Sequence, residues 1–166
     1  MVVKSMSYNA IDLLNKSVET SKNILTLFEN AKNDINDSHS SSIIMNIFIK
    51  HQNKKIDYYK SLQKELYNRD VTEIDCFLYD KISSLITLYN SKLKFQCPKN
   101  TRELIQSIID INKDLRALYI DVRGRIIKNE QGWKSTEFEV LTEMITLQES
   151  YIKELEKSYM KNYGYH

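Results

Sequence analysis

The sequence predicts an all-α protein, an antiparallel four-helix bundle of two helical hairpins with an additional helix in the crossover between them. Glycine and proline are scarce, with three Gly and one Pro in 166 residues, whereas strand-rich proteins need both at their turns. Apolar residues recur at spacings of three, four and seven along most of the chain, which is the spacing of one helix face. The composition is 42% hydrophobic and 28% charged, as in globular domains. We therefore expect a single helical-bundle domain over residues 1–166.

The first part of the chain predicts one helical hairpin, with helices over residues 7–33 and 41–67. The apolar stripe of the first helix is Ile11, Leu14, Val18, Leu25 and Phe28. The stripe of the second helix is Ile44, Phe48, Lys55, Tyr59, Leu62 and Leu66. Asn, Asp and Ser dominate residues 33–40. Because these side chains bond to their own backbone, this stretch predicts a polar turn.

A third and shorter helix is predicted over residues 71–93, in the connection between the hairpins. Asp70 and Glu73 have the spacing of a capping box at its start. Its apolar stripe continues to Tyr89. Pro98 then breaks the chain, because proline cannot continue a helix.

The last part of the chain predicts a second long hairpin, with helices over residues 101–128 and 136–160. Asn100 with Glu103 predicts the cap of the fourth helix, and Thr136 with Glu139 predicts a capping box at the fifth. A long helix of about 26 residues spans roughly 39 Å at the α-helical rise. Long antiparallel helices with short connections pack as a bundle.

The two hairpins share a weak internal repeat. Asn15 and Asn112, 97 positions apart, lie in the similar sequences Asn-Lys-Ser-Val and Asn-Lys-Asp-Leu. Gln52 and Gln148, 96 positions apart, are each followed four residues later by isoleucine. Two offsets that agree within one residue suggest a duplicated hairpin. Each amide lies within the apolar stripe of its helix, so we expect all four to face the bundle core.

With these positions the chain resembles the ferritin-like superfamily, in particular its rubrerythrin-like branch. The resemblance covers nearly the whole chain as architecture and spacing. That family is a four-helix bundle of two hairpins joined by a long crossover. Each hairpin supplies a Glu from its first helix and a Glu-x-x-His from its second, and together these bind two iron ions. The resemblance puts the six ligand positions at Asn15, Gln52, Lys55, Asn112, Gln148 and Tyr151.

All six positions depart from the family pattern, so the resemblance implies a degenerate di-iron site. Four carboxylates, which are costly to bury unless a cation neutralises them, are replaced by amides that have similar volume and can bond to one another. Lys55 would bring a fixed positive charge to the place where the family binds metal. We therefore expect a polar core layer with no metal, cofactor or catalytic residue. The resemblance then implies a non-catalytic protein with a structural or protein-binding role.

Two alternatives stay open. One is a metal-binding ferritin-like oxidase or storage protein with a rearranged site. Such a site could use Glu143 and Glu149 on the fifth helix, or Asp110 and Asp114 on the fourth. His51 adjoins the core face of the second helix, where a lone histidine is more often a packed residue than a metal ligand. The other alternative is an unrelated small helical adaptor.

Composition also restricts partners and compartment. The net charge is +2, with 24 basic and 22 acidic residues mixed along the chain, which argues against a nucleic-acid surface. Its apolar runs are far shorter than a membrane helix requires. Two cysteines without a Cys-x-x-Cys motif, and an N-terminus without a signal-like apolar run, predict a cytoplasmic protein. Eleven tyrosines suit half-buried helix interfaces, so we expect self-association as a homodimer or binding to another protein.

Overall fold

The computed structural model describes residues 7–34, 39–95, 98–128 and 132–164, and within them the chain is almost entirely helical. The elements follow the order β1 (Tyr8–Asn9), α1 (Ala10–Asp34), α2 (His39–Leu66), β2 (Glu73–Ile74), α3 (Cys76–Lys92), α4 (Thr101–Ile127), the 3₁₀ turn η1 (Gly132–Lys134) and α5 (Thr136–Tyr163). The prediction of an all-α protein is confirmed for these residues, with one two-residue antiparallel strand pair added.

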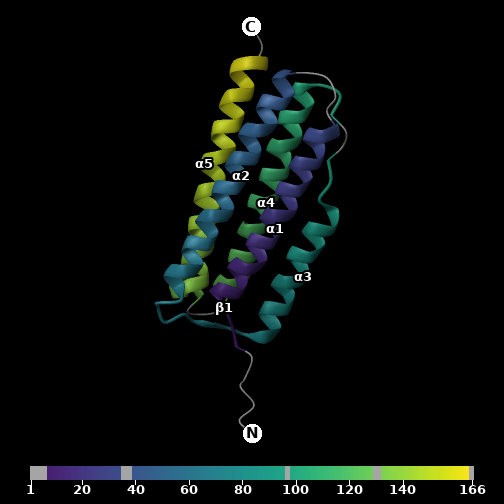
Figure 1. Ribbon diagram of the computed structural model, residues 1–166. Helices are drawn as coiled ribbons and strands as arrows, with labels where there is room; N and C mark the ends of the chain where they lie inside the picture. The colour runs from purple at the N-terminus through teal and green to yellow at the C-terminus, as the bar shows by residue number, and fades with distance from the viewer. Residues whose placement is uncertain (1–6, 35–38, 96–97, 129–131, 165–166) are drawn as a thin grey trace.

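The long helices are arranged as two antiparallel pairs. α1 packs along α2, and α4 packs along α5 (Figure 1). α1 and α5 run in one direction, while α2 and α4 run in the other. The connection from α2 to α4 carries the chain from one end of the molecule to the other, and α3 lies within it against α1 and α4. Among the described residues, none of the helices has the length and apolar content needed to cross a membrane.

The observed caps of α4 and α5 can be compared with the predicted ones. Asn100 Oδ1 accepts a hydrogen bond from the Glu103 backbone N–H at 2.9 Å, so the predicted cap of α4 is confirmed. At α5 the cap is Ser135, whose Oγ accepts from the backbone N–H of Phe138 at 3.2 Å. The predicted capping box that began at Thr136 is therefore wrong by one residue, and the Glu139 backbone N–H instead donates to the Ser135 backbone oxygen at 3.2 Å.

The start of α3 also differs from the prediction. The capping box from Asp70 to Glu73 is wrong, because Glu73 lies in the extended strand β2 and pairs with β1. The cap is Asp75, whose carboxylate accepts from the backbone N–H three residues later at 3.1 Å. Tyr8 of β1 stacks on Tyr79 of α3, with ring centroids 3.8 Å apart. The first strand is therefore attached to the start of the connection between the hairpins.

The buried face of α1 is rotated from the predicted one. Leu13, Ser17, Ser21 and Ile24 are buried, along with Leu14, Val18, Thr20, Phe28 and Ala31. Asn15 is exposed, so the expectation that it faces the core is wrong. The stripe had been drawn through large apolar residues, whereas small hydroxyl side chains occupy part of the buried face of α1. Because Ser17 and Ser21 belong to the buried face of α1, Asn15 lies on the solvent side of the helix.

Candidate functional site

Five of the six residues at the predicted polar layer lie in the interior. α2 contributes two of them, α4 one and α5 two, and none is more than 5% exposed: Gln52, Lys55, Asn112, Gln148 and Tyr151. The sixth, Asn15, lies on the exposed side of α1, where its Oδ1 accepts a hydrogen bond from Gln63 Nε2 at 2.6 Å. The layer is therefore built from α2, α4 and α5, without the amide predicted on α1.

Asn112 is the centre of this layer. Its Oδ1 accepts hydrogen bonds from Lys55 Nζ at 3.2 Å and from Gln148 Nε2 at 2.5 Å. Gln148 Nε2 also lies 3.2 Å from the Asn112 backbone oxygen. Asn112 Nδ2 donates to the backbone oxygen of Ile108, one turn earlier, at 2.7 Å. One amide thus connects three helices and has partners for both its Oδ1 and its Nδ2, whereas Gln148 Oε1 is buried without a partner among the described residues.

Lys55 is a buried lysine whose hydrogen-bond partner is neutral. Its Nζ lies 5.3 Å from the centre of the Tyr151 ring, a distance at which the ring face attracts a cation. Burial lowers the pKa of Lys55 to about 7, because an ammonium loses its hydration in the core. At neutral pH the amine is therefore present in both forms. The expected fixed positive charge is replaced by one that titrates in the physiological range.

Gln52 does not join the cluster around Asn112. Its Nε2 donates to the backbone oxygen of Ser21 on α1 at 2.9 Å, so it connects the two helices of the first hairpin. Within the described residues, Gln52 Oε1 and Ser21 Oγ are buried without a hydrogen-bond partner. The four predicted amides thus separate into the pair Asn112–Gln148, a single Gln52 one hairpin away, and a surface Asn15.

His51 and Tyr151 form a stacked pair beside this layer, which the sequence did not predict. Their ring centroids are 3.6 Å apart, and the ring planes differ by 10°. Desolvation, with the nearby Lys55 and Lys54 charges, lowers the pKa of His51 to about 4, so His51 is neutral at physiological pH. Desolvation also raises the pKa of Tyr151. In the described part of the chain, His51 Nδ1 and the Tyr151 hydroxyl are both buried without a hydrogen-bond partner.

The residues of this layer do not fit the di-iron centre that the resemblance implies for the family. A primary amine, a phenol and amides stand at the ligand positions, whereas iron sites of this class use carboxylates and imidazoles. The described residues include no group of three or more His, Cys, Asp or Glu side chains that could hold a metal ion.

Three of the four acidic residues considered for a shifted site have other partners. Glu143 accepts a hydrogen bond from the Tyr58 hydroxyl at 3.0 Å. Glu149 forms an ion pair with Arg116 at 3.0 Å. Asp110 accepts from the side-chain amide of Gln106 at 2.9 Å. These carboxylates lie in surface interactions between or along helices.

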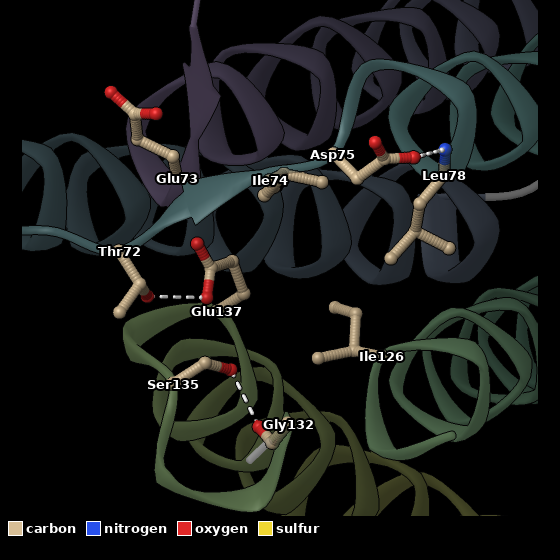
Figure 2. A pocket seen from close by; sticks show the side chains of 9 residues that line it. All are labelled: Thr72, Glu73, Ile74, Asp75, Leu78, Ile126, Gly132, Ser135 and Glu137. Carbon is tan, nitrogen blue, oxygen red and sulfur yellow. Dashed lines mark hydrogen bonds between the residues drawn. The ribbon is translucent and has the colours of Figure 1, made fainter. Parts of the chain in front are cut away.

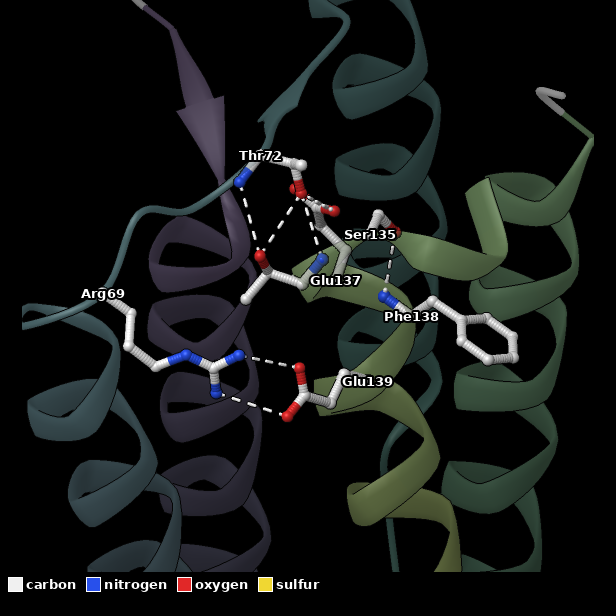
Figure 3. A network of polar contacts seen from close by, with 7 residues as sticks. Arg69, Thr72, Ser135, Glu137, Phe138 and Glu139 are labelled. Atoms are coloured by element: carbon white, nitrogen blue, oxygen red, sulfur yellow. Dashed lines mark hydrogen bonds and ion pairs between the residues drawn. The ribbon is translucent and has the colours of Figure 1, made fainter. Parts of the chain in front are cut away.

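A second polar cluster lies at the start of α5, where the connection between the hairpins meets the second hairpin (Figure 3). Thr72 Oγ1 donates to Glu137 Oε2 at 2.7 Å and accepts from the Thr136 backbone N–H at 3.0 Å. Beside it, Arg69 and Glu139 form an exposed ion pair at 3.0 Å. Glu137 is only 2% exposed and lies in the first turn of α5. Thr72 therefore fastens the connection to α5.

The same cluster borders a small pocket of about 190 Å³. Figure 2 shows its walls, which come from β2, the start of α3, the end of α4 and the turn before α5. Among the described residues, Glu137 Oε1 is a buried oxygen without a hydrogen-bond partner. No protein-family model, curated protein or solved structure matches this chain.

Proposed function

We propose that the protein is a non-catalytic, ferritin-like four-helix bundle without a metal site, and that its role is structural or protein-binding. Two features support this proposal. The chain forms two antiparallel helix pairs joined by a connection that runs the length of the molecule, which is the order of elements in that family. The hydrogen bond from Lys55 Nζ to Asn112 Oδ1 at 3.2 Å is the observation that carries the metal-free part.

The physical argument concerns charge and the available acceptors. When Lys55 is protonated, its ammonium repels any cation placed within a few ångströms of it, and the repulsion is strong in a core of low dielectric. Asn112 Oδ1 already accepts from two donors, Lys55 and Gln148. A metal ion would have to displace both donors and would gain only neutral amide oxygens. The hydrogen-bonded layer is therefore more stable without a metal ion than with one.

Metal analysis tests this proposal. The chain is purified without chelator, its iron, manganese and zinc contents are measured by inductively coupled plasma mass spectrometry, and its Tm is recorded with and without EDTA. We expect metal contents well below one ion per chain and a Tm that EDTA does not change, because no ligand free energy contributes to folding. Iron or manganese retained in stoichiometric amount through gel filtration, with a Tm that falls in EDTA, would refute the metal-free reading.

The protein-binding part of the proposal has a candidate surface on α3, and we assign it to a second copy of this chain. Phe77 is 69% exposed and Leu88 is 50% exposed. They are separated by eleven positions, about three helical turns, so they share one face of α3. They lie roughly 16 Å apart along the helix, so they would be two apolar contact points on one surface.

Light scattering coupled to gel filtration tests this surface. We expect a homodimer for the wild-type chain, and a monomer for the double variant Phe77→Ser with Leu88→Ser. Tyr67→Ser is the matched control, because Tyr67 is 70% exposed but lies after α2. A wild-type chain that remains monomeric across the concentration range, or a dimer that the double variant preserves, would contradict the assignment.

A further inference from the structure

A cavity of about 350 Å³ lies between the first half of α2 and the second half of α5, which are at the same end of the molecule in Figure 1. Ile44 and Phe48 of α2, Ile105 of α4 and Leu155 of α5 form much of its wall. A cavity of roughly 150 Å³ lined by such residues is known to hold benzene. This one therefore has room for a molecule about twice as large, and its volume falls in the range of small-molecule sites.

The His51–Tyr151 stack forms a polar part of the cavity wall. Tyr151 is 5% exposed, and neither its hydroxyl nor His51 Nδ1 has a hydrogen-bond partner among the described residues. A buried polar group without a partner costs about 1–3 kcal/mol. Both side chains line one cavity, and their unsatisfied atoms have almost no accessible surface, so a ligand with a hydrogen-bonding group would reach them after a small shift of either side chain. The two unsatisfied atoms and the cavity volume are independent observations, and both point to a ligand.

The charges around the cavity select against an ionic ligand. Glu154 is exposed and lines the cavity, where its carboxylate disfavours an anion. Lys55 lies behind the Tyr151 ring, where its partial positive charge disfavours a cation. His51 lines the wall in its neutral form. A cation would gain Glu154 but meet the charge of Lys55, and an anion would gain Lys55 but meet Glu154, so neither recovers the hydration that it loses on entering.

We propose that this cavity binds an uncharged, mainly apolar small molecule with one hydroxyl or carbonyl group. The apolar body packs against Ile44, Phe48 and Leu155, and the polar group bonds to the Tyr151 hydroxyl or to His51 Nδ1. This site is distinct from the Asn112 cluster and from the exposed face of α3. Ligand binding here goes beyond the structural or self-associating role proposed above. The inference also does not depend on whether the protein binds metal.

Calorimetric titration with two matched probes tests the proposal. 2-Naphthol is uncharged at neutral pH and carries one hydroxyl, and naphthalene has the same ring system without it. We expect saturable binding of 2-naphthol at one site, about fivefold tighter than naphthalene, which corresponds to one net hydrogen bond. In Tyr151→Phe the two affinities should become closer, while naphthalene binding stays near its wild-type value.

Two tryptophan variants locate the binding. Ser158 is exposed and lines the cavity, so Ser158→Trp should block it and abolish binding of both probes. Ser61→Trp is the control, because Ser61 is exposed on α2 and does not line the cavity. Circular dichroism verifies that each variant is folded. The proposal is overturned if 2-naphthol shows no saturable binding to the wild type up to its solubility limit, or if Ser158→Trp binds it as tightly as Ser61→Trp. If the wild type binds both probes with equal affinity, the proposed hydrogen bond between the ligand and Tyr151 or His51 is refuted.

Discussion

Lys55→Met should remove a rise in stability that the wild-type protein shows as the pH increases from 6 to 9. Lys55 has a pKa lowered to about 7 by burial, whereas an unfolded lysine has a pKa of about 10.4. Between these two values the unfolded chain binds more protons than the folded one, so the free energy of unfolding increases with pH. Below pH 7 the lysine is protonated in both states, and the folded state carries the full cost of a buried ammonium.

The size of the effect follows from the pKa difference. Each pH unit above the folded pKa adds about 1.36 kcal/mol until the unfolded pKa is reached, so Lys55 contributes about 2.7 kcal/mol between pH 6 and pH 9. Methionine has a similar length and no charge. Asn112 Oδ1 keeps its hydrogen bond from Gln148 in the variant, so no acceptor is left unpaired. The variant should therefore be more stable than the wild type at pH 6, with the advantage decreasing toward pH 9.

Urea unfolding followed by circular dichroism at several pH values, at constant ionic strength, measures this difference. Lys60→Met is the control, because Lys60 is exposed on the same helix. Lys55 is one cause of the lowered pKa of His51, so Lys55→Met also weakens the His51 contribution, which has the same sign and is confined to pH values below about 6.5. The reasoning is refuted if Lys55→Met shows the same pH slope as the wild type and Lys60→Met.

Three further substitutions test other contacts by urea unfolding at neutral pH. Asn112→Leu removes the acceptor of Lys55 and one of the two acceptors of Gln148 and should cost about 3 kcal/mol, and less when Lys55→Met is also present, because the Lys55 donor is then gone. Thr72→Val removes the hydroxyl that bonds to buried Glu137 and should cost about 1–3 kcal/mol. Asn100→Ala removes the side-chain cap of α4 and should cost about 1 kcal/mol.

Each of these has a matched control. Asn53→Ala changes an exposed asparagine on α2, and a cost equal to that of Asn112→Leu would contradict the role of the buried amide. Thr87→Val removes an exposed hydroxyl that bonds to its own helix, and it should change stability less than Thr72→Val. Asn100→Asp keeps a capping oxygen, so a loss as large as that of Asn100→Ala would exclude the cap as the cause.

The helices could be predicted because their signals are local. Scarcity of glycine and proline, with apolar spacing, located all five helices in the described chain, and Asn100 marked the start of α4 within one residue. The strand pair could not be predicted in this way. Its two strands have two residues each and are stabilised by a partner about 65 positions away, so no local period reveals them. Glu73 was assigned to a cap for that reason.

The burial of the candidate-site residues could be predicted where large apolar residues flank them on the same helix. Lys55 and Gln148 lie in stripes of bulky apolar residues, and both are buried as expected. Asn15 was misplaced because the true buried face of α1 includes Ser17 and Ser21, which an apolar count ignores. The stack of His51 on Tyr151 depends on how α2 and α5 are placed side by side, and single-helix periodicity contains no information about that.

The pairing of β1 with β2 bears on how copies of this chain could exchange parts. In domain swapping, the connection between two halves opens, and each half packs on the partner's complementary half. Here the connection between the hairpins is held at its start by β1, which precedes α1 directly, and by the stack of Tyr8 on Tyr79. A swap that used this connection as its hinge would have to release both contacts, or exchange only the segment beyond α3. The short sheet therefore keeps the crossover on its own first hairpin and favours association through intact surfaces.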